Sequence, residues 1–217
     1  YYLNGFHSHF FGEEKAKHLL SVLSDIKDNS LKENFSLEEK YRGTLDLRPE
    51  AVDYDEEILS FLFSSGLYEK LREVTSQELS LYHVQIRVAY PESNISSMSY
   101  MDWHRDTYYK SGHKLGFFPP AHKIIFYPDL GAGMAEGLKM IPGSQKAEIH
   151  VDQTYEGGSL NNFDKSLISG IDETRITSSN SSAVIFNTAI LHGACQIIGE
   201  PKVRLIYSFV SKEQSLK

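Results

Sequence analysis

The 217-residue sequence contains one cysteine, Cys195, which excludes an intrachain disulfide and a zinc site built from several thiolates. It has no apolar run near the roughly 18 residues that a membrane-spanning helix needs. Its first residues also lack the basic-then-apolar pattern of a secretory signal. We therefore expect a cytoplasmic protein with no membrane partner.

The chain is also short of basic residues, because 22 Lys and Arg stand against 29 Asp and Glu and give a formal net charge of -7. Such a chain has no general attraction for a phosphate backbone, so we expect a small-molecule partner and no nucleic acid. Hydrophobic residues make up 41% of the sequence, enough for a packed core. The length is typical of one domain over residues 1–217 and does not indicate an oligomeric state.

Apolar residues recur at helical spacing in the first part of the chain. The pattern predicts three helices, at 16–26, 53–65 and 67–75. With a short strand at 41–47, residues 1–78 should be mainly helical. Strands separated by Gly, Pro, Asn and Ser clusters follow over 79–217, and the polar stretch 152–180 is expected to be an excursion from them. The sequence predicts a mainly β fold with flanking helices.

The segment 81–90 alternates between apolar and polar residues, which is the period of a strand with two different faces. Its apolar face, which begins at Tyr82, is expected to pack in the core. Its polar face carries Gln85 and Arg87. That face is either exposed to solvent or lines a pocket for a polar ligand, and the pattern leaves both open.

The segment Trp103-His104-Arg105-Asp106 contains the pattern His-x-Asp. Side chains two residues apart in a strand point to the same side, so His104 and Asp106 can bind one metal ion. His192, near the start of a later strand, is the best candidate for a third ligand. Two histidines and one carboxylate hold non-haem Fe(II) and leave coordination positions open. The tripeptide alone is weak evidence, because a hydrogen-bonded pair at a strand end has the same sequence.

Arg204 follows His192 by twelve residues, across a turn at Gly199-Glu200-Pro201. A hairpin there would bring Arg204 into the pocket of the metal ligands. Its planar guanidinium can bond both oxygens of a carboxylate, which suits the distal carboxylate of 2-oxoglutarate while the keto-acid end binds iron. The alternative is an exposed arginine paired with Glu200.

The order of these motifs resembles the phytanoyl-CoA dioxygenase-like branch of the Fe(II)- and 2-oxoglutarate-dependent oxygenases. The likeness covers most of the chain and rests on an N-terminal helix, His104-x-Asp106, the turn Pro142-Gly143-Ser144, His192-Gly193 and Arg204. It implies a double-stranded β-helix, the jelly roll of cupin-like proteins, with flanking helices. It also implies that His104, Asp106 and His192 are the catalytic iron ligands and that Arg204 binds 2-oxoglutarate.

The resemblance further implies that O2 and 2-oxoglutarate are consumed, that succinate and CO2 are released, and that an unactivated C–H of the substrate is hydroxylated. Related halogenases have a small residue at the carboxylate position, so Asp106 favours hydroxylation. Gln85 and Ser208 are further candidates for binding 2-oxoglutarate. The chain departs from the pattern at Gln145, where the family usually has histidine, and at Ile206, where some relatives have serine.

The connection 107–121 directly follows the predicted ligand strand, and so long a loop is often a lid or a binding loop. Its Tyr108 and Lys110, together with Arg87, suit a small polar substrate with an anionic group, although a plain solvated loop has the same residues. Two other functions fit a jelly roll. A cupin-like dioxygenase or isomerase that does not use 2-oxoglutarate predicts a dispensable Arg204, and a non-enzymatic binding module predicts no tight divalent metal.

Overall fold

Nine strands form two antiparallel sheets in the part of the chain that the structure, a computed structural model, describes. The described residues are 5–10, 17, 19, 21–25, 44–46, 56–89, 103–106, 122–127, 136–146, 169–177, 182–195 and 202–212. No helix among them has both the length and the apolar character that a membrane span requires.

The large sheet has the strand order β1-β7-β4-β9-β3-β2. In that order its strands span Phe6–Phe10, Ser182–Asn187, His122–Tyr127, Lys202–Ser211, Leu79–Ala89 and Thr44–Asp46. The small sheet has the order β6-β5-β8, with strands at Thr174–Thr177, Glu136–Met140 and His192–Ala194. An isolated bridge between His104 and His192 continues the small sheet past β8. The antiparallel β body that the sequence predicts is therefore present.

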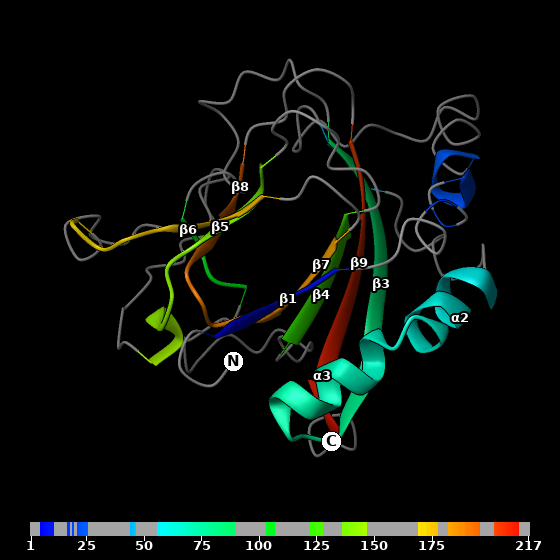
Figure 1. The fold of residues 1–217 in the computed structure, drawn as a ribbon, viewed down its shortest axis with the longest axis horizontal. Helices are drawn as coiled ribbons and strands as arrows, with labels where there is room; N and C mark the ends of the chain where they lie inside the picture. The colour runs from blue at the N-terminus through cyan, green and yellow to red at the C-terminus, as the bar shows by residue number, and fades with distance from the viewer. Residues whose placement is uncertain are drawn as a thin grey trace, which may run out of the picture.

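Two helices cover the face of the large sheet that points away from the small sheet, which we call the outer face (Figure 1). They are α2 at Glu56–Ser64 and α3 at Leu67–Thr75. Apolar residues three and four positions apart give each helix one buried side, as at Ile58, Phe61 and Leu62 of α2. Gly66 separates the helices with a φ of +80°, a conformation that costs glycine little.

The outer face is packed with apolar and aromatic side chains. Strand β9 contributes every second residue to it, namely Val203, Leu205, Tyr207 and Phe209. The ring of Phe61 lies on Phe126 of β4 with the centroids 4.9 Å apart. Because side chains alternate along a strand, the residues between these positions point the other way.

The opposite face of the large sheet, which we call the inner face, packs against the small sheet. Its apolar part joins strands of both sheets in one cluster, made of Ile125, Tyr127, Leu138, Met140, Ile176, Val184, Phe186, Ile190 and Ile206. Polar residues share this face, because Gln85 and Ser208 alternate with outer-core positions and are buried. The polar side of the segment 81–90 therefore faces the interior of the protein, not solvent.

The N-terminal part contributes strands as well as helices. Strand β1, which the sequence pattern does not predict, pairs with β7, and β2 lies within the expected strand at 41–47. The predicted helix at 67–75 is confirmed, and α2 lies inside 53–65. Residues 21–25 of the first predicted helix are helical.

The hairpin expected between the strands of His192 and Arg204 is not what the described strands form, because β8 pairs with β5 in the small sheet and β9 lies in the large sheet. Two further expectations about strands are wrong. The stretch 152–180, expected to leave the β body, contains β6, which pairs with β5 and buries Ile176. Tyr82, expected in the core, is 47% exposed. A register shift between Leu81 and His83 puts it out of phase with the rest of β3, as a β-bulge does.

Candidate metal and cofactor site

His104, Asp106 and His192 form a cluster at the edge of the small sheet. One ligand atom from each of them lies within 4.8 Å of the other two. The Nε2 atom of His192 is 3.2 Å from Oδ2 of Asp106, and Nε2 of His104 is 3.8 Å from Oδ1. Donor atoms bound about 2 Å from one ion have separations of this order. The three residues singled out in the sequence are thus brought together in a set that fits a divalent metal.

Backbone hydrogen bonds fix the segments that carry these three side chains. The amides of His104 and His192 each donate to the carbonyl of the other, at 2.8 and 2.9 Å. The amide of Asp106 donates to the carbonyl of Thr188 at 3.0 Å. Both ends of the His-x-Asp segment are therefore attached to the β7–β8 region that carries the third member of the cluster.

Arg105 and Ser144 form a second connection between the same segments. Arg105 is buried, and its Nη2 atom donates to the carbonyl of Ser144 at 2.6 Å. The hydroxyl of Ser144 accepts the amide of Leu191 at 2.8 Å, one residue before His192. The turn at Pro142-Gly143-Ser144 thus joins the segment of His104 and Asp106 to the segment of His192, which gives this turn a structural role.

The imidazole of His192 is held in one orientation. Its Nδ1 atom donates to the carbonyl of Ile190 at 2.9 Å, because a carbonyl oxygen can only accept. The ring also packs on Phe186, with the centroids 4.9 Å apart. With Nδ1 bonded to the carbonyl of Ile190, Nε2 is the ring nitrogen that faces Asp106, and it is the atom that could bind a metal.

Lys123 also belongs to the cluster, although no motif in the sequence pointed to it. Its Nζ atom lies 2.9 Å from Oδ2 of Asp106. Burial raises the pKa of Asp106, but the Lys123 ammonium and the neighbouring His192 and His104 more than offset this and hold that pKa well below its usual range. The carboxylate is therefore ionised and available to a cation.

A second polar group lies on the inner face, around Arg204 and Tyr127. Both side chains are buried, and the guanidinium carbon of Arg204 is 5.6 Å from the centroid of the Tyr127 ring. Within the described residues, neither Nε of Arg204 nor the hydroxyl of Tyr127 has a hydrogen-bond partner. Buried polar atoms are rarely left unpaired, so this arrangement fits a ligand that accepts hydrogen bonds, such as a carboxylate.

Tyr127 remains a neutral hydrogen-bond donor in this setting. Burial raises its pKa to about 12, although the nearby Arg204 and Arg87 act in the opposite direction. Gly137 makes room for the ring, because a Cβ atom there would lie 2.7 Å from Cζ of Tyr127. The tyrosine can therefore donate its proton to an anion without losing it.

The other candidate residues divide between the two ends of the inner face. Ser208 is the register partner of both Lys123 and His83, so it lies at the metal end. Arg87 is the register partner of Arg204, so it lies at the opposite end from the cluster of His104, Asp106 and His192. Gln85 is buried between these ends. Tyr108 and Lys110 lie outside the described residues.

Lys123 and Tyr127 had a sequence signal that went unused. They occupy alternate positions of β4, at 123 and 127, and share their face with Ile125. The segment reads as a continuous apolar run because Ile124 and Phe126 fill the outer face. The period of two places Lys123 and Tyr127 on one face of β4, opposite Ile124 and Phe126.

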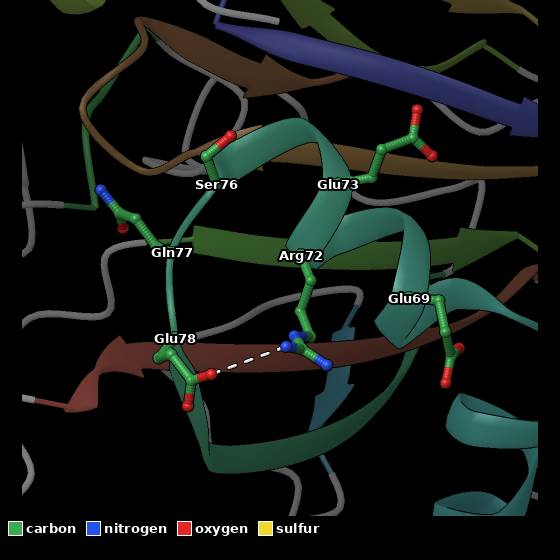
Figure 2. A pocket seen from close by; sticks show the side chains of 6 residues that line it. All are labelled: Glu69, Arg72, Glu73, Ser76, Gln77 and Glu78. Atoms are coloured by element: carbon green, nitrogen blue, oxygen red, sulfur yellow. Dashed lines mark ion pairs between the residues drawn. The ribbon is translucent and has the colours of Figure 1, made fainter.

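A hollow at the C-terminal end of α3 is separate from this site (Figure 2). It is lined by Glu69, Arg72, Glu73, Ser76, Gln77 and Glu78. Three of its charged groups form ion pairs: Arg72 and Lys212 lie 3.5 and 3.0 Å from Glu78, and Lys70 lies 2.8 Å from Glu73. Gln77 contacts His122 of β4 on the outer side of the large sheet. The hollow contains no residue of the inner face.

Solved structures share the fold of this chain at low sequence identity. HygX from Streptomyces hygroscopicus, with nickel and 2-oxoglutarate bound, is 14% identical with a TM-score of 0.60, and the match covers 97% of this chain and 84% of that one. EctD from S. alaskensis, with 2-oxoglutarate and 5-hydroxyectoine, is 13% identical with a TM-score of 0.59 over 98% and 74%. SnoN, a non-heme alpha-ketoglutarate-dependent epimerase from nogalamycin biosynthesis, is 11% identical with a TM-score of 0.66 over 97% and 80%.

These similarities confirm the predicted jelly-roll fold. No protein-family model matches the sequence, and no curated protein matches it. The particular branch of the oxygenases named from the sequence therefore stays a prediction.

Proposed function

We propose that this chain is an Fe(II)- and 2-oxoglutarate-dependent oxygenase that hydroxylates an unactivated C–H of a small polar metabolite, and that residues 1–217 form one domain around this site. The observation that carries the proposal is the pairing of two features on facing sheets. One is the cluster of His104, Asp106 and His192, and the other is the buried Arg204 beside Tyr127. A metal alone would account for the first feature but not for the second.

The donor set fits iron. Two imidazoles and one carboxylate are the ligands of non-haem Fe(II) oxygenases, and they leave positions open for 2-oxoglutarate and O2. When bound, iron and 2-oxoglutarate supply oxidation by O2, in which one oxygen atom enters succinate, the other enters the substrate hydroxyl, and CO2 leaves. In this proposal His104, Asp106 and His192 hold the metal, and the hydrogen bond from His192 to Ile190 keeps its Nε2 on the metal side.

Arg204 would bind the distal carboxylate of 2-oxoglutarate, with Tyr127 as a second donor. Both are buried, so a carboxylate there would meet fixed donors with little competition from water. Gln85 and Ser208 lie on the same face and would bind the rest of the molecule. Arg87 is the register neighbour of Arg204, so we assign it to the 2-oxoglutarate end and no longer to the substrate.

The type of oxidation follows from the metal set. Asp106 occupies the position that a halogenase would leave to chloride. The product should therefore gain an oxygen atom, and no chlorine, even in high chloride. The similarity to the epimerase SnoN shows that one fold hosts different outcomes, so epimerisation is the second candidate reaction. Incorporation of 18O from labelled O2 into the product distinguishes hydroxylation from epimerisation.

The proposal is tested by succinate formation from 2-oxoglutarate with Fe(II) and a panel of small polar metabolites. We expect at least one metabolite to accelerate succinate formation, and we expect His104→Ala to abolish it while the variant stays folded. Lys139→Met is a matched control, because Lys139 lies beside the ring of Trp103 and is the register partner of Gly193, not of a metal ligand. Equal turnover by the wild type and His104→Ala would refute the proposal.

A further inference from the structure

An ammonium group lies within the metal cluster itself. Lys123 reaches from the inner face of β4, and its Nζ atom is 2.9 Å from Oδ2 of Asp106. The same oxygen is 3.2 Å from Nε2 of His192. The side chains of Lys123 and Asp106 are only 18% and 21% exposed, so water screens this ion pair weakly. The lysine therefore occupies the electrostatic position that a metal ion would take.

A divalent ion and this ammonium would compete for one carboxylate. An ion held by His104, Asp106 and His192 would lie within a few ångströms of Nζ, where like charges repel strongly even at an effective dielectric constant of about 20. Metal binding also neutralises the carboxylate with which Lys123 is paired. A cation left there without a counter-charge would be costly in a half-buried site.

A second anion would remove this cost, and 2-oxoglutarate is a dianion. The inner face carries a cation at each end. Lys123 is the register partner of Ser208, and Ser208 lies four residues from Arg204 along β9. A linear dicarboxylate can meet both cations. Arg204 would take its distal carboxylate, which leaves Lys123 for the carboxylate at the metal end.

We propose that Lys123 is the counter-cation of the metal-free site, that it leaves Asp106 when a divalent metal binds, and that it then pairs with the metal-end carboxylate of 2-oxoglutarate. This inference rests on the proposed function. Its consequence is cooperative binding, since each of metal and 2-oxoglutarate relieves a charge imbalance that the other creates. Lys123 is thus a positioning residue that makes the protein hold metal and cosubstrate together.

The test is calorimetric titration with Ni(II), which avoids oxidation of iron, in the absence and presence of 2-oxoglutarate. For the wild type we expect 2-oxoglutarate to tighten Ni(II) binding by about tenfold or more. For Lys123→Met we expect Ni(II) alone to bind about tenfold more tightly than to the wild type, because a nearby positive charge is gone. The additional gain from 2-oxoglutarate should then shrink to a few-fold.

Two variants serve as controls. Lys139→Met removes a lysine charge from β5, the strand that pairs with β8 of His192. The ammonium of Lys139 lies over the ring of Trp103, so this variant should bind Ni(II) like the wild type. Lys123→Arg keeps the charge and should keep the cooperativity. If Lys123→Met does not give folded protein, Lys123→Gln carries the same test with a neutral side chain that is more polar.

Two results would overturn the inference, and they differ from failure of the proposed function. If Lys123→Met binds Ni(II) as weakly as the wild type, or more weakly, the lysine only orients Asp106 and the inference is wrong. If Lys123→Met binds Ni(II) more tightly, but 2-oxoglutarate tightens its Ni(II) binding as much as in the wild type, the proposed pairing of Lys123 with 2-oxoglutarate is wrong. If the wild type and His104→Ala bind Ni(II) alike, there is no metal site and both proposals fail.

Discussion

The outer and inner faces of the large sheet are both buried, but they bury different chemistry. Tyr207 on the outer face donates its hydroxyl to the carbonyl of Ile58 in α2 at 2.6 Å. Tyr127 on the inner face is equally buried, yet its hydroxyl has no partner among the described residues. The outer face thus satisfies its polar groups within the protein, whereas the inner face keeps donors available.

The charged residues show the same division. Buried or half-buried Lys, Arg and Asp side chains lie on the inner face and at the facing edge of the small sheet, as Lys123, Arg204 and Asp106 do, whereas the buried His122 lies on the outer side. Burying charge costs stability, and the helices over the outer face supply apolar packing that can offset it. Because side chains alternate along β9 and β4, the same strands present apolar residues to the outer face and charged residues to the inner face. Substitutions on the two faces should therefore have separable effects.

The largest expected effect on stability is on the outer face. Phe126→Ala removes a fully buried ring that packs on Phe61, and we expect it to lower the free energy of unfolding by about 3 to 5 kcal/mol. Urea unfolding followed by circular dichroism measures this loss. The folded fraction should still bind Ni(II) with the affinity of the wild type. A large loss of metal affinity would show that the two faces are not separable.

The corresponding substitution on the inner face is Arg204→Ala. We expect it to weaken 2-oxoglutarate binding by roughly 2 to 5 kcal/mol, the range for removing one partner of a buried charge pair. Its free energy of unfolding without ligand should not fall much, because Nε of Arg204 makes no hydrogen bond within the described chain. Titration calorimetry of the Ni(II)-loaded protein measures the binding. Unchanged affinity would favour a cupin-like enzyme that does not use 2-oxoglutarate.

A pH effect is expected from His122, which contacts Gln77 on the outer side of β4. Burial lowers its pKa from 6.5 to about 4. Between these values the unfolded chain binds a proton that the folded chain excludes, so stability falls as the pH drops from 6.5 to about 4. The full loss is about 3.5 kcal/mol at most, because the pKa differs by about 2.5 units and each unit corresponds to about 1.4 kcal/mol.

Unfolding of the wild type and His122→Asn at pH 7.5 and pH 4.5 measures this contribution. The loss between the two pH values should be smaller in the variant, which cannot take up the proton. Other groups titrate in both proteins and cancel in the difference. An equal loss in the two proteins would mean that His122 is not buried as a neutral base.

The smallest expected effect compares the two buried tyrosines directly. Tyr207→Phe leaves the contact with Ile58 unmade and should lower the free energy of unfolding by about 1 to 2 kcal/mol. Tyr127→Phe removes an unpartnered hydroxyl, so the stability without ligand should stay level or rise. Only Tyr127→Phe should weaken 2-oxoglutarate binding. Equal destabilisation by both changes would erase the distinction between the faces.

The sequence predicted the candidate metal cluster because its geometry is local or periodic. A spacing of two residues in strand-like backbone places His104 and Asp106 on one side. The order of motifs along the chain pointed to His192 and Arg204. The mainly β fold and the helix at 67–75 followed from the same periodicity. Neighbours along the chain decide these predictions, except for His192 and Arg204, which only the order of motifs in the resemblance identified.

The features that the sequence did not predict depend on distant neighbours. Strands β1 and β6 are short and acquire their structure from β7 and β5, so their own patterns are weak. Tyr82 was placed on the wrong side because a register shift interrupts the alternation of β3. Lys123 was overlooked because its importance lies in a contact with Asp106, seventeen residues earlier, that depends on how β4 packs.

The assignment of the inner face can be tested by a crystal structure of the protein with Ni(II) and 2-oxoglutarate. We expect an anomalous nickel peak between His104, Asp106 and His192, with the distal carboxylate of 2-oxoglutarate bonded to Arg204 and Tyr127. We also expect that Nζ of Lys123 has left Asp106. Nickel bound elsewhere, or a 2-oxoglutarate molecule that does not reach Arg204, would contradict the assignment of the inner face as an oxygenase site.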